Sequence, residues 1–273
     1  MTIELKKRIL TGAFGAALLL GIIAYGGTLG ILFLATLISF GMIFEFAEMT
    51  LSMSDRTEKR YLLLLLTWLV AILNFLIPHA EFSLLVFSFL SLFTYFLISA
   101  KNHGGIDQAT HFKELMFAFF GLIYLGFIPT YFSRIYEVPS GSRWLMLFLF
   151  IVWAGDTGAY FAGKKFGKRK LYFAISPNKT IEGGIGGLAV SMFITLIFKL
   201  FFLQGMSWFL VFFVPLIVGI TAQVGDLCES FLKRAFDKKD SGTILPGHGG
   251  FLDRFDGVVF SLPVMYACIR VLG

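Results

Sequence analysis

Cysteine and charge are both scarce in this 273-residue sequence. Its two cysteines, Cys228 and Cys268, fit neither a disulfide framework nor a zinc-ligand spacing, and we interpret both as packing residues. Charged residues make up 15% of the chain, whereas soluble domains have about 25%. The composition therefore argues against a soluble, disulfide-stabilised or zinc-binding protein.

Apolar residues are correspondingly abundant. The chain is 57% hydrophobic with a mean hydropathy of +0.82, and its apolar residues come in runs long enough to cross a bilayer as helices. These runs lack the alternation of a membrane β-barrel. We predict an all-α polytopic membrane protein with about nine transmembrane helices, near residues 8–26, 28–49, 61–79, 82–100, 114–133, 143–163, 183–203, 207–229 and 257–272.

The distribution of basic residues predicts the orientation. With the N-terminus inside, the inner segments hold 19 of the 23 Lys/Arg residues, and the outer segments hold only Arg134, Arg143 and Arg270. Cytoplasmic loops carry such an excess. We expect a cytoplasmic N-terminus, a C-terminus outside, and residence in the cell inner (plasma) membrane. The net charge of +6 then reflects topology and anionic lipid rather than nucleic acid as a partner.

Polar residues are unevenly divided along the chain. We interpret residues 1–140 as a scaffold of transmembrane helices and residues 141–273 as the catalytic region, because eight carboxylates from Asp156 onward gather in or beside the predicted inner loops 164–182 and 230–256. Asp156 itself lies inside an apolar run, where a carboxylate is costly and usually functional. We expect Gly155 and Gly158 beside it to let the backbone approach a ligand.

The first inner loop combines basic and turn-forming residues. Gly158 to Lys165 falls short of a P-loop because it lacks the Ser/Thr and follows no strand. We predict that Thr180 caps a helix and that Asn178 and Lys179 contact phosphate. Small-residue faces permit a homodimer; they are Gly12/Gly15 and Gly183/Gly187.

The second loop is preceded by a helix that we expect to continue into it. On that helix Asp226, Ser230, Lys233 and Asp237 share one face. The loop itself ends in ILPGHGGFLDRFDG, whose glycines give phosphate oxygens access to the backbone. Asp253 and Asp256 project together at the start of the last helix, and such carboxylates beside phosphate suit Mg²⁺.

These spacings resemble a known family. The pattern is similar to the signature of phosphatidate cytidylyltransferases, also called CDP-diacylglycerol synthases, over roughly residues 150–270; it reads Ser230-x-x-Lys233-Arg234, Lys239-Asp240-x-Gly242 and Leu245-Pro246-x-His248-Gly249-Gly250-x-x-Asp253-Arg254-x-Asp256. The resemblance implies that CTP and phosphatidic acid react to CDP-diacylglycerol and pyrophosphate, at a site on the cytoplasmic face of the membrane.

The resemblance and the residue chemistry together predict the site. The expected catalytic residues are Asp226, Asp253, Asp256, Lys233 and Arg254, and the three aspartates are the expected ligands of one or two Mg²⁺ ions. The expected substrate-binding residues are Asp156, Ser176, Asn178, Lys179, Thr180, Ser230, Arg234, Lys239, Asp240, His248, Gly249 and Gly250. The expected partners are CTP, phosphatidic acid and membrane lipid.

Two alternatives remain open at this stage. An ion-coupled transporter would also place carboxylates such as Asp156 and Asp226 inside apolar runs, although transporters gather them at the membrane midplane. A CDP-alcohol phosphotransferase would also use aspartates and Mg²⁺, but its motif D-G-x-x-A-R…G-x-x-x-D-x-x-x-D is not found in this sequence.

Overall fold

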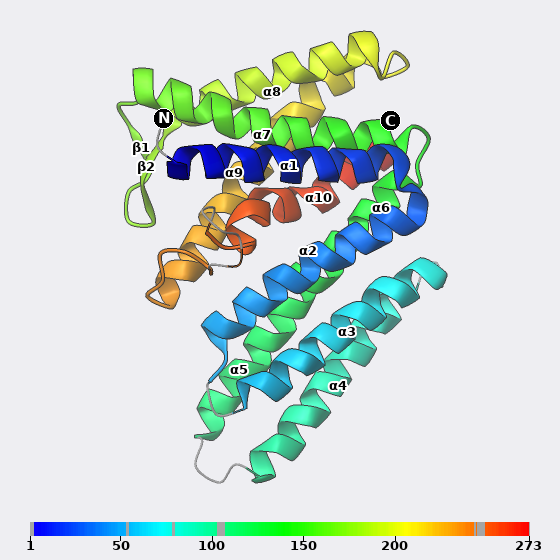
Figure 1. Cartoon of the computed structure of the whole chain (residues 1–273), viewed down its shortest axis with the longest axis vertical. Helices are drawn as coiled ribbons and strands as arrows, with labels where there is room; N and C mark the ends of the chain where they lie inside the picture. Colours follow the sequence, from blue (N-terminus) through cyan, green and yellow to red (C-terminus); the bar gives the residue numbers. More distant parts are fainter. Residues whose placement is uncertain are drawn as a thin grey trace.

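The computed structural model describes residues 3–52, 55–77, 80–102, 107–242, 244 and 249–272. Within these ranges the protein is helical apart from one short hairpin (Figure 1). The elements are α1 (Ile3–Tyr25), α2 (Gly27–Thr50), α3 (Arg56–Leu76), α4 (Glu81–Asn102), α5 (Gln108–Gly121), the π-helix η1 (Leu122–Phe127), the 3-10 helix η2 (Ile128–Thr130), α6 (Tyr131–Tyr136), α7 (Gly141–Phe166), β1 (Lys170–Tyr172), β2 (Ser176–Thr180), α8 (Ile181–Phe201), α9 (Trp208–Ala235) and α10 (Leu252–Leu272).

The predicted fold class is confirmed. In the described part of the chain, eight helices are long and apolar enough to cross a membrane, and α5 to α6 form one such span, Gln108–Tyr136. The remaining helix, α1, has a shorter apolar segment, Thr11–Tyr25. A turn at Gly27, whose φ of +62° suits glycine, separates α1 from α2. Each of the nine apolar runs thus forms a helix.

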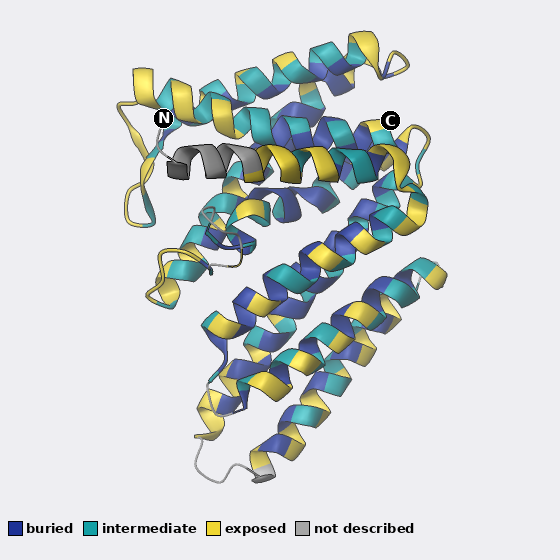
Figure 2. Ribbon diagram, viewed as in Figure 1, coloured by how far each residue is buried: buried dark blue, intermediate teal, exposed yellow. Residues whose placement is uncertain are grey.

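The helices form two groups that α2 joins (Figure 1). One group contains α3, α4 and α5, and the other contains α7, α8, α9 and α10. Helix α2 contacts α3 and α5 in the first group and α10 in the second. Exposed positions occur along the helices of both groups (Figure 2). Many of the exposed residues are large and apolar, as expected for surfaces in contact with lipid. Whether the two groups correspond to separate scaffold and catalytic regions stays a prediction.

Glycines bring α7 and α8 together. A Cβ atom on Gly155 would lie 2.8 Å from Ser191 Oγ, and one on Gly187 would lie 2.7 Å from the Gly155 carbonyl oxygen. Gly158 and Gly183 also face the opposite helix. The predicted packing face at Gly183 and Gly187 is therefore real, but it serves contacts within the chain. The expectation that Gly155 and Gly158 face a ligand is wrong, because these glycines accommodate α8.

The connection between α7 and α8 contains a hairpin that the sequence did not predict. Strands β1 and β2 pair antiparallel, with Lys170 opposite Thr180 and Tyr172 opposite Ser176. Glu182 closes its base by accepting hydrogen bonds from the backbone N–H groups of Lys168 and Arg169, at 3.0 and 3.1 Å. Thr180 Oγ1 accepts from Gly183 N at 3.1 Å, which confirms the predicted helix cap.

The end of α9 differs from the expected one, whereas the start of α10 confirms the predicted place of Asp253 and Asp256. Helix α9 ends at Ala235, and Asp237 follows with a left-handed φ of 53°, so Asp237 does not share the helical face predicted for it. Helix α10 begins at Leu252 and therefore includes Asp253 and Asp256 in its first turns. Of the two cysteines, Cys268 is buried as predicted, whereas Cys228 is exposed and is not a packing residue.

Candidate active site

A cavity of about 730 Å³ lies where α7, the hairpin, α8, α9 and α10 meet. Each of these elements contributes side chains or backbone to its wall. The lining residues are Trp153, Asp156, Ala159, Tyr160, Gly163, Lys164, Leu171, Asn178, Lys179, Thr180, Gly183, Gly184, Gln223, Asp226, Lys233, Asp253, Arg254 and Asp256. Segments far apart in the sequence, from Trp153 to Asp256, thus form one polar cavity among apolar helices.

Helix α9 supplies two charged groups to this wall. Asp226 and Lys233 lie about two turns apart, as predicted, and both line the cavity. Asp226 forms an ion pair with Lys179 of β2, which joins the hairpin to α9. One turn before Asp226, Gln223 Nε2 donates a hydrogen bond to the Gly184 carbonyl oxygen at 3.1 Å. The hairpin and α8 are therefore held against α9 by polar contacts.

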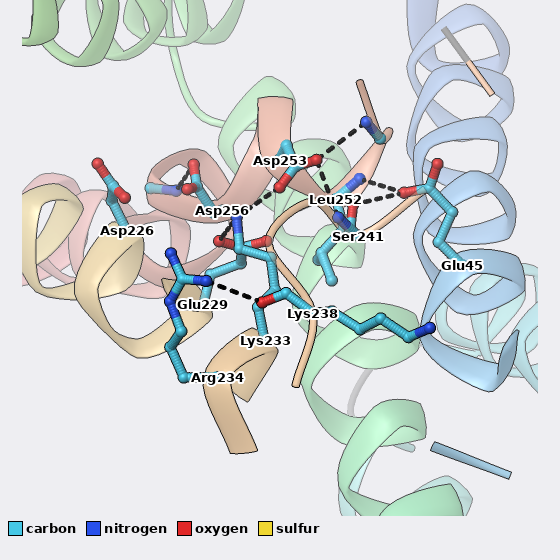
Figure 3. A network of polar contacts seen from close by, with 12 residues as sticks. Glu45, Asp226, Glu229, Lys233, Arg234, Lys238, Ser241, Leu252, Asp253 and Asp256 are labelled. Atoms are coloured by element: carbon cyan, nitrogen blue, oxygen red, sulfur yellow. Dashed lines mark hydrogen bonds and ion pairs between the residues drawn. The ribbon is translucent and has the colours of Figure 1, made fainter. Parts of the chain in front are cut away.

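Asp253 on α10 is engaged through both of its carboxylate oxygens (Figure 3). Its Oδ1 accepts from Lys233 Nζ at 2.6 Å. Its Oδ2 accepts from the backbone N–H groups of Gly250 at 2.9 Å and Ser241 at 3.1 Å. Lys233 also pairs with Glu229 Oε2 at 2.7 Å, one turn earlier on α9. The lysine is thus held between two carboxylates.

Three further aspartates form the acidic part of the cavity. Asp226 interacts electrostatically with both Asp156 and Asp256, although these residues lie on three different helices. Asp256 Oδ1 accepts a hydrogen bond from Gly257 N at 2.6 Å. Like charges raise the energy of such a group unless a cation is near. Lys179, already paired with Asp226, places a positive charge beside this group.

The carboxylates fit a magnesium ion that arrives with a phosphate ligand. Among the described residues, no three acidic, histidine or cysteine side chains stand close enough together to form a complete metal site. Mg²⁺ commonly takes only one or two carboxylates, with phosphate oxygens and water completing its shell. The adjoining Asp226 and Asp256 suit that arrangement, whereas Asp253 already accepts from Lys233 and two amides.

Comparisons with known proteins show the family of the chain. A model of the cytidylyltransferase family matches residues 6–272. The chain belongs to the cytidylyltransferase family. It is 33% identical to the phosphatidate cytidylyltransferase of Bacillus subtilis (strain 168), over 99% of this chain and all of that protein. It is also similar to proteins of the same name from Staphylococcus saprophyticus (40% identity) and Staphylococcus aureus strain COL (42%), each over 67% of this chain and 66% of theirs.

The family match extends the sequence-based resemblance. That resemblance rested on roughly residues 150–270, whereas the cytidylyltransferase model also includes the first five apolar runs. The predicted family is therefore confirmed for nearly the whole chain. The family model therefore covers the N-terminal half of the chain as well as the segments that line the cavity.

Most of the predicted catalytic set lines the cavity, and part of the predicted substrate-binding set does not. All five predicted catalytic residues and Asp156, Asn178, Lys179 and Thr180 lie in its wall. The residues outside the wall are Ser176, Ser230, Arg234, Lys239, Asp240, Gly249 and Gly250. Among these, Arg234 donates to the Lys238 carbonyl oxygen at 3.2 Å, and Gly250 supports Asp253 through its backbone. His248 lies outside the described residues.

Sequence reasoning missed two polar residues around this site. Glu229 is buried beside Lys233. Glu45 of α2 is buried against Ser241 and Leu252 in the second loop (Figure 3). Glu45 carried a signal, because a carboxylate inside an apolar run is costly and usually has a role. Glu45 was not among the predicted site residues because it lies in the half interpreted as scaffold.

Proposed function

We propose that this member of the cytidylyltransferase family transfers the cytidylyl group of CTP to phosphatidic acid and releases pyrophosphate. The observation that carries the proposal is the convergence of Lys179, Lys233 and Arg254 with four aspartates in one cavity between membrane-spanning helices. One wall, at Tyr160 of α7, is also exposed on the protein surface. Such a cavity suits a polyanionic nucleotide and a lipid phosphate together.

The reaction requires mainly that the substrates are positioned and that their negative charge is neutralised. A phosphate oxygen of phosphatidic acid forms a bond to the α-phosphorus of CTP. The bond from that phosphorus to the oxygen bridging to the β-phosphate breaks, and its electron pair leaves with pyrophosphate. The lipid phosphate is already ionised at neutral pH, so this step requires no general base.

The basic residues of the cavity take the phosphate-binding role in this proposal. Lys179 and Lys233 each pair with an aspartate, Asp226 and Asp253 respectively, and each exchanges part of that pairing for a substrate phosphate. Arg254 lies on the exposed side of the same wall and adds a further guanidinium donor. Asn178, also in the wall, offers an amide hydrogen-bond donor.

The aspartates divide into two groups in this proposal. Asp226 and Asp256 would hold Mg²⁺, and Asp156 would hydrogen-bond its water ligands. A bound magnesium ion would neutralise phosphate charge and stabilise the departing pyrophosphate. Asp253, which was predicted from the sequence as a metal ligand together with Asp226 and Asp256, takes in this proposal the role of orienting Lys233 through the contacts described above.

We further propose that the cavity opens on the cytoplasmic side of the cell inner membrane. The hairpin, the end of α9 and the beginning of α10 lie toward the same side of the molecule (Figure 1). Their segments include the basic residues that cytoplasmic loops typically carry, such as Lys168, Lys170 and Lys238. A homodimer stays a prediction, since the Gly183/Gly187 face is occupied by α7.

The test uses detergent-purified protein with CTP, phosphatidic acid and MgCl₂. We expect one CDP-diacylglycerol and one pyrophosphate per turnover, and loss of both products when EDTA exceeds the magnesium. Diacylglycerol and phosphatidylcholine serve as control lipids, because neither offers a terminal phosphate. If phosphatidic acid yields no cytidylyl lipid under conditions in which the protein stays monodisperse, the proposal is wrong.

A further inference from the structure

We propose that Glu45 is a positioning residue for the active site: from α2, it holds the loop that orients Asp253 and, through Asp253, Lys233. This inference deepens the proposed function and rests on it for its catalytic part. It assigns a role in the reaction to the N-terminal half of the chain.

Glu45 contacts the loop between α9 and α10 and also the start of α10. Its side chain lies almost wholly inside the protein, with the residue 2% exposed. Oε2 accepts one hydrogen bond from Ser241 Oγ at 2.9 Å and another from Leu252 N at 3.0 Å (Figure 3). Ser241 follows α9 after a short turn, and Leu252 begins α10. One carboxylate oxygen therefore ties the loop residue Ser241 to the first residue of α10.

Asp253 completes the same arrangement from the other side. The backbone N–H of Ser241, whose hydroxyl contacts Glu45, donates to Asp253 Oδ2 at 3.1 Å. Leu252, held by Glu45, directly precedes Asp253 in α10. Asp253 Oδ1 then receives Lys233 Nζ at 2.6 Å. A displacement of the Glu45 carboxylate would consequently move both Asp253 and the lysine in the cavity wall.

The loop packs so closely on Glu45 that side chains are excluded. A Cβ atom on Gly242 would lie 2.5 Å from Glu45 Oε1, and one on Gly250 would lie 2.6 Å from Glu45 Oε2 and 1.8 Å from Ser241 Oγ. Real Cβ atoms do not approach other atoms so closely. The two glycines of the signature pattern therefore make room for Glu45 as well as for the turn.

Stability alone does not account for a carboxylate at this position. Glu45 lies in an apolar helix, and its Oε1 is buried without a hydrogen-bond partner among the described residues. An unsatisfied buried carboxylate oxygen lowers stability, and an apolar side chain would avoid that loss. Groups that cost stability and aim at an active site are commonly retained for their geometry.

The kinetic test compares Glu45→Ala with Glu45→Gln in the full-length protein. Glutamine keeps a carbonyl oxygen for Ser241 and Leu252, whereas alanine removes the acceptor. We expect kcat to fall on the order of tenfold to a hundredfold in Glu45→Ala, the size that small misplacements of reacting groups cause. The KM for CTP should change by less than threefold, and Glu45→Gln should retain at least a third of kcat. Glu48→Gln is the matched control, since Glu48 pairs with Arg56 and Arg60 on the exposed side of α2.

Hydrogen–deuterium exchange without substrate tests the anchor independently of activity. In Glu45→Ala, peptides containing Ser241, Gly250 and Leu252 should exchange faster than in the wild type, while those from the first half of α9 should not change. Ser241→Ala should give a smaller effect of the same kind, and should add nothing to Glu45→Ala, because Glu45→Ala already removes the contact that Ser241→Ala removes. If Glu45→Ala fails to fold, Ser241→Ala tests the anchor in its place.

Each outcome has a distinct meaning. Unchanged loop exchange in Glu45→Ala, or in Ser241→Ala where the former does not fold, overturns the anchor. Faster exchange with kcat within twofold of the wild type overturns the positioning role and leaves Glu45 a structural residue. Loss of kcat that Glu45→Gln fails to rescue also contradicts the proposal. If the wild type itself makes no cytidylyl lipid, the proposed function fails, and the exchange result still decides the anchor.

Discussion

Lys233 Nζ on α9 lies 2.6 Å from Asp253 Oδ1 on α10, and this ion pair joins the two helices at the wall of the cavity. Both side chains are largely shielded from solvent, at 13% and 12% exposure. Glu229 Oε2 lies on the other side of the lysine at 2.7 Å. The lysine therefore has a structural role as well as the proposed role toward phosphate.

Removal of the lysine should affect stability and catalysis together. Lys233→Ala leaves Glu229 and Asp253 without their shared cation, and breaking such a shielded pair typically costs about 3 kcal/mol in the free energy of unfolding. We expect a lower unfolding midpoint and a large fall in kcat. Adding Glu229→Gln should restore part of the stability but not kcat. Lys238→Ala, at an exposed position beyond α9, is the control; if Lys233→Ala is as stable as this control, the ion pair has little structural importance.

The division of roles among the aspartates predicts their magnesium dependence. Asp226→Asn and Asp256→Asn should each raise the Mg²⁺ concentration for half-maximal activity by at least about tenfold. Even substitution of residues that only support metal ligands typically lowers metal affinity by about that factor. Asp237→Asn should titrate like the wild type, because Asp237 is exposed past the end of α9, where asparagine also tolerates a left-handed backbone. A second titration adds Ca²⁺ as a competitor of Mg²⁺ for the site. Wild-type Mg²⁺ curves for both cavity variants would refute the assignment.

The contact between Gly250 and Ser241 predicts the cost of a single methyl group. In Gly250→Ala the new Cβ would lie 1.8 Å from Ser241 Oγ, so the loop must move. We expect a loss of about 1–3 kcal/mol in the free energy of unfolding, as overpacking typically causes, together with lower kcat. Gly205→Ala is the matched control, because its Cβ would meet no atom within 4 Å. Equal midpoints and rates for the two variants would show that the loop has room that the structure does not indicate.

The helices could be predicted from the sequence because their signal is strong and local. A run of about 20 apolar residues has few structural alternatives, and each predicted run coincides with a helix. Helix ends were less accurate, since apolar composition marks the membrane core rather than the last hydrogen-bonded turn. Helix α9 was expected to continue as far as Asp237 but ends at Ala235, and the apolar run near 257–272 belongs to a helix that already begins at Leu252.

Contacts between distant segments could not be predicted in the same way. The hairpin has strands of only three and five residues, and its pairing depends on Glu182 bonding back to Lys168 and Arg169. Glu45 and Ser241 are 196 residues apart, and no periodicity relates them. The signature residues, by contrast, could be predicted to cluster because their spacing resembled a family. Even there, only the structure revealed that Asp253 accepts from Lys233 rather than pointing freely into the cavity.

The fate of the individual CTP phosphates tests the central claim most directly. Purified protein is incubated with phosphatidic acid, magnesium and CTP labelled with ³²P at either the α- or the γ-phosphate, and lipid and aqueous products are then separated. The account predicts that α-label enters the lipid, that γ-label leaves entirely in pyrophosphate, and that lipid label and pyrophosphate form in equal amounts. Entry of γ-label into lipid, or no labelled lipid from either nucleotide, would contradict it.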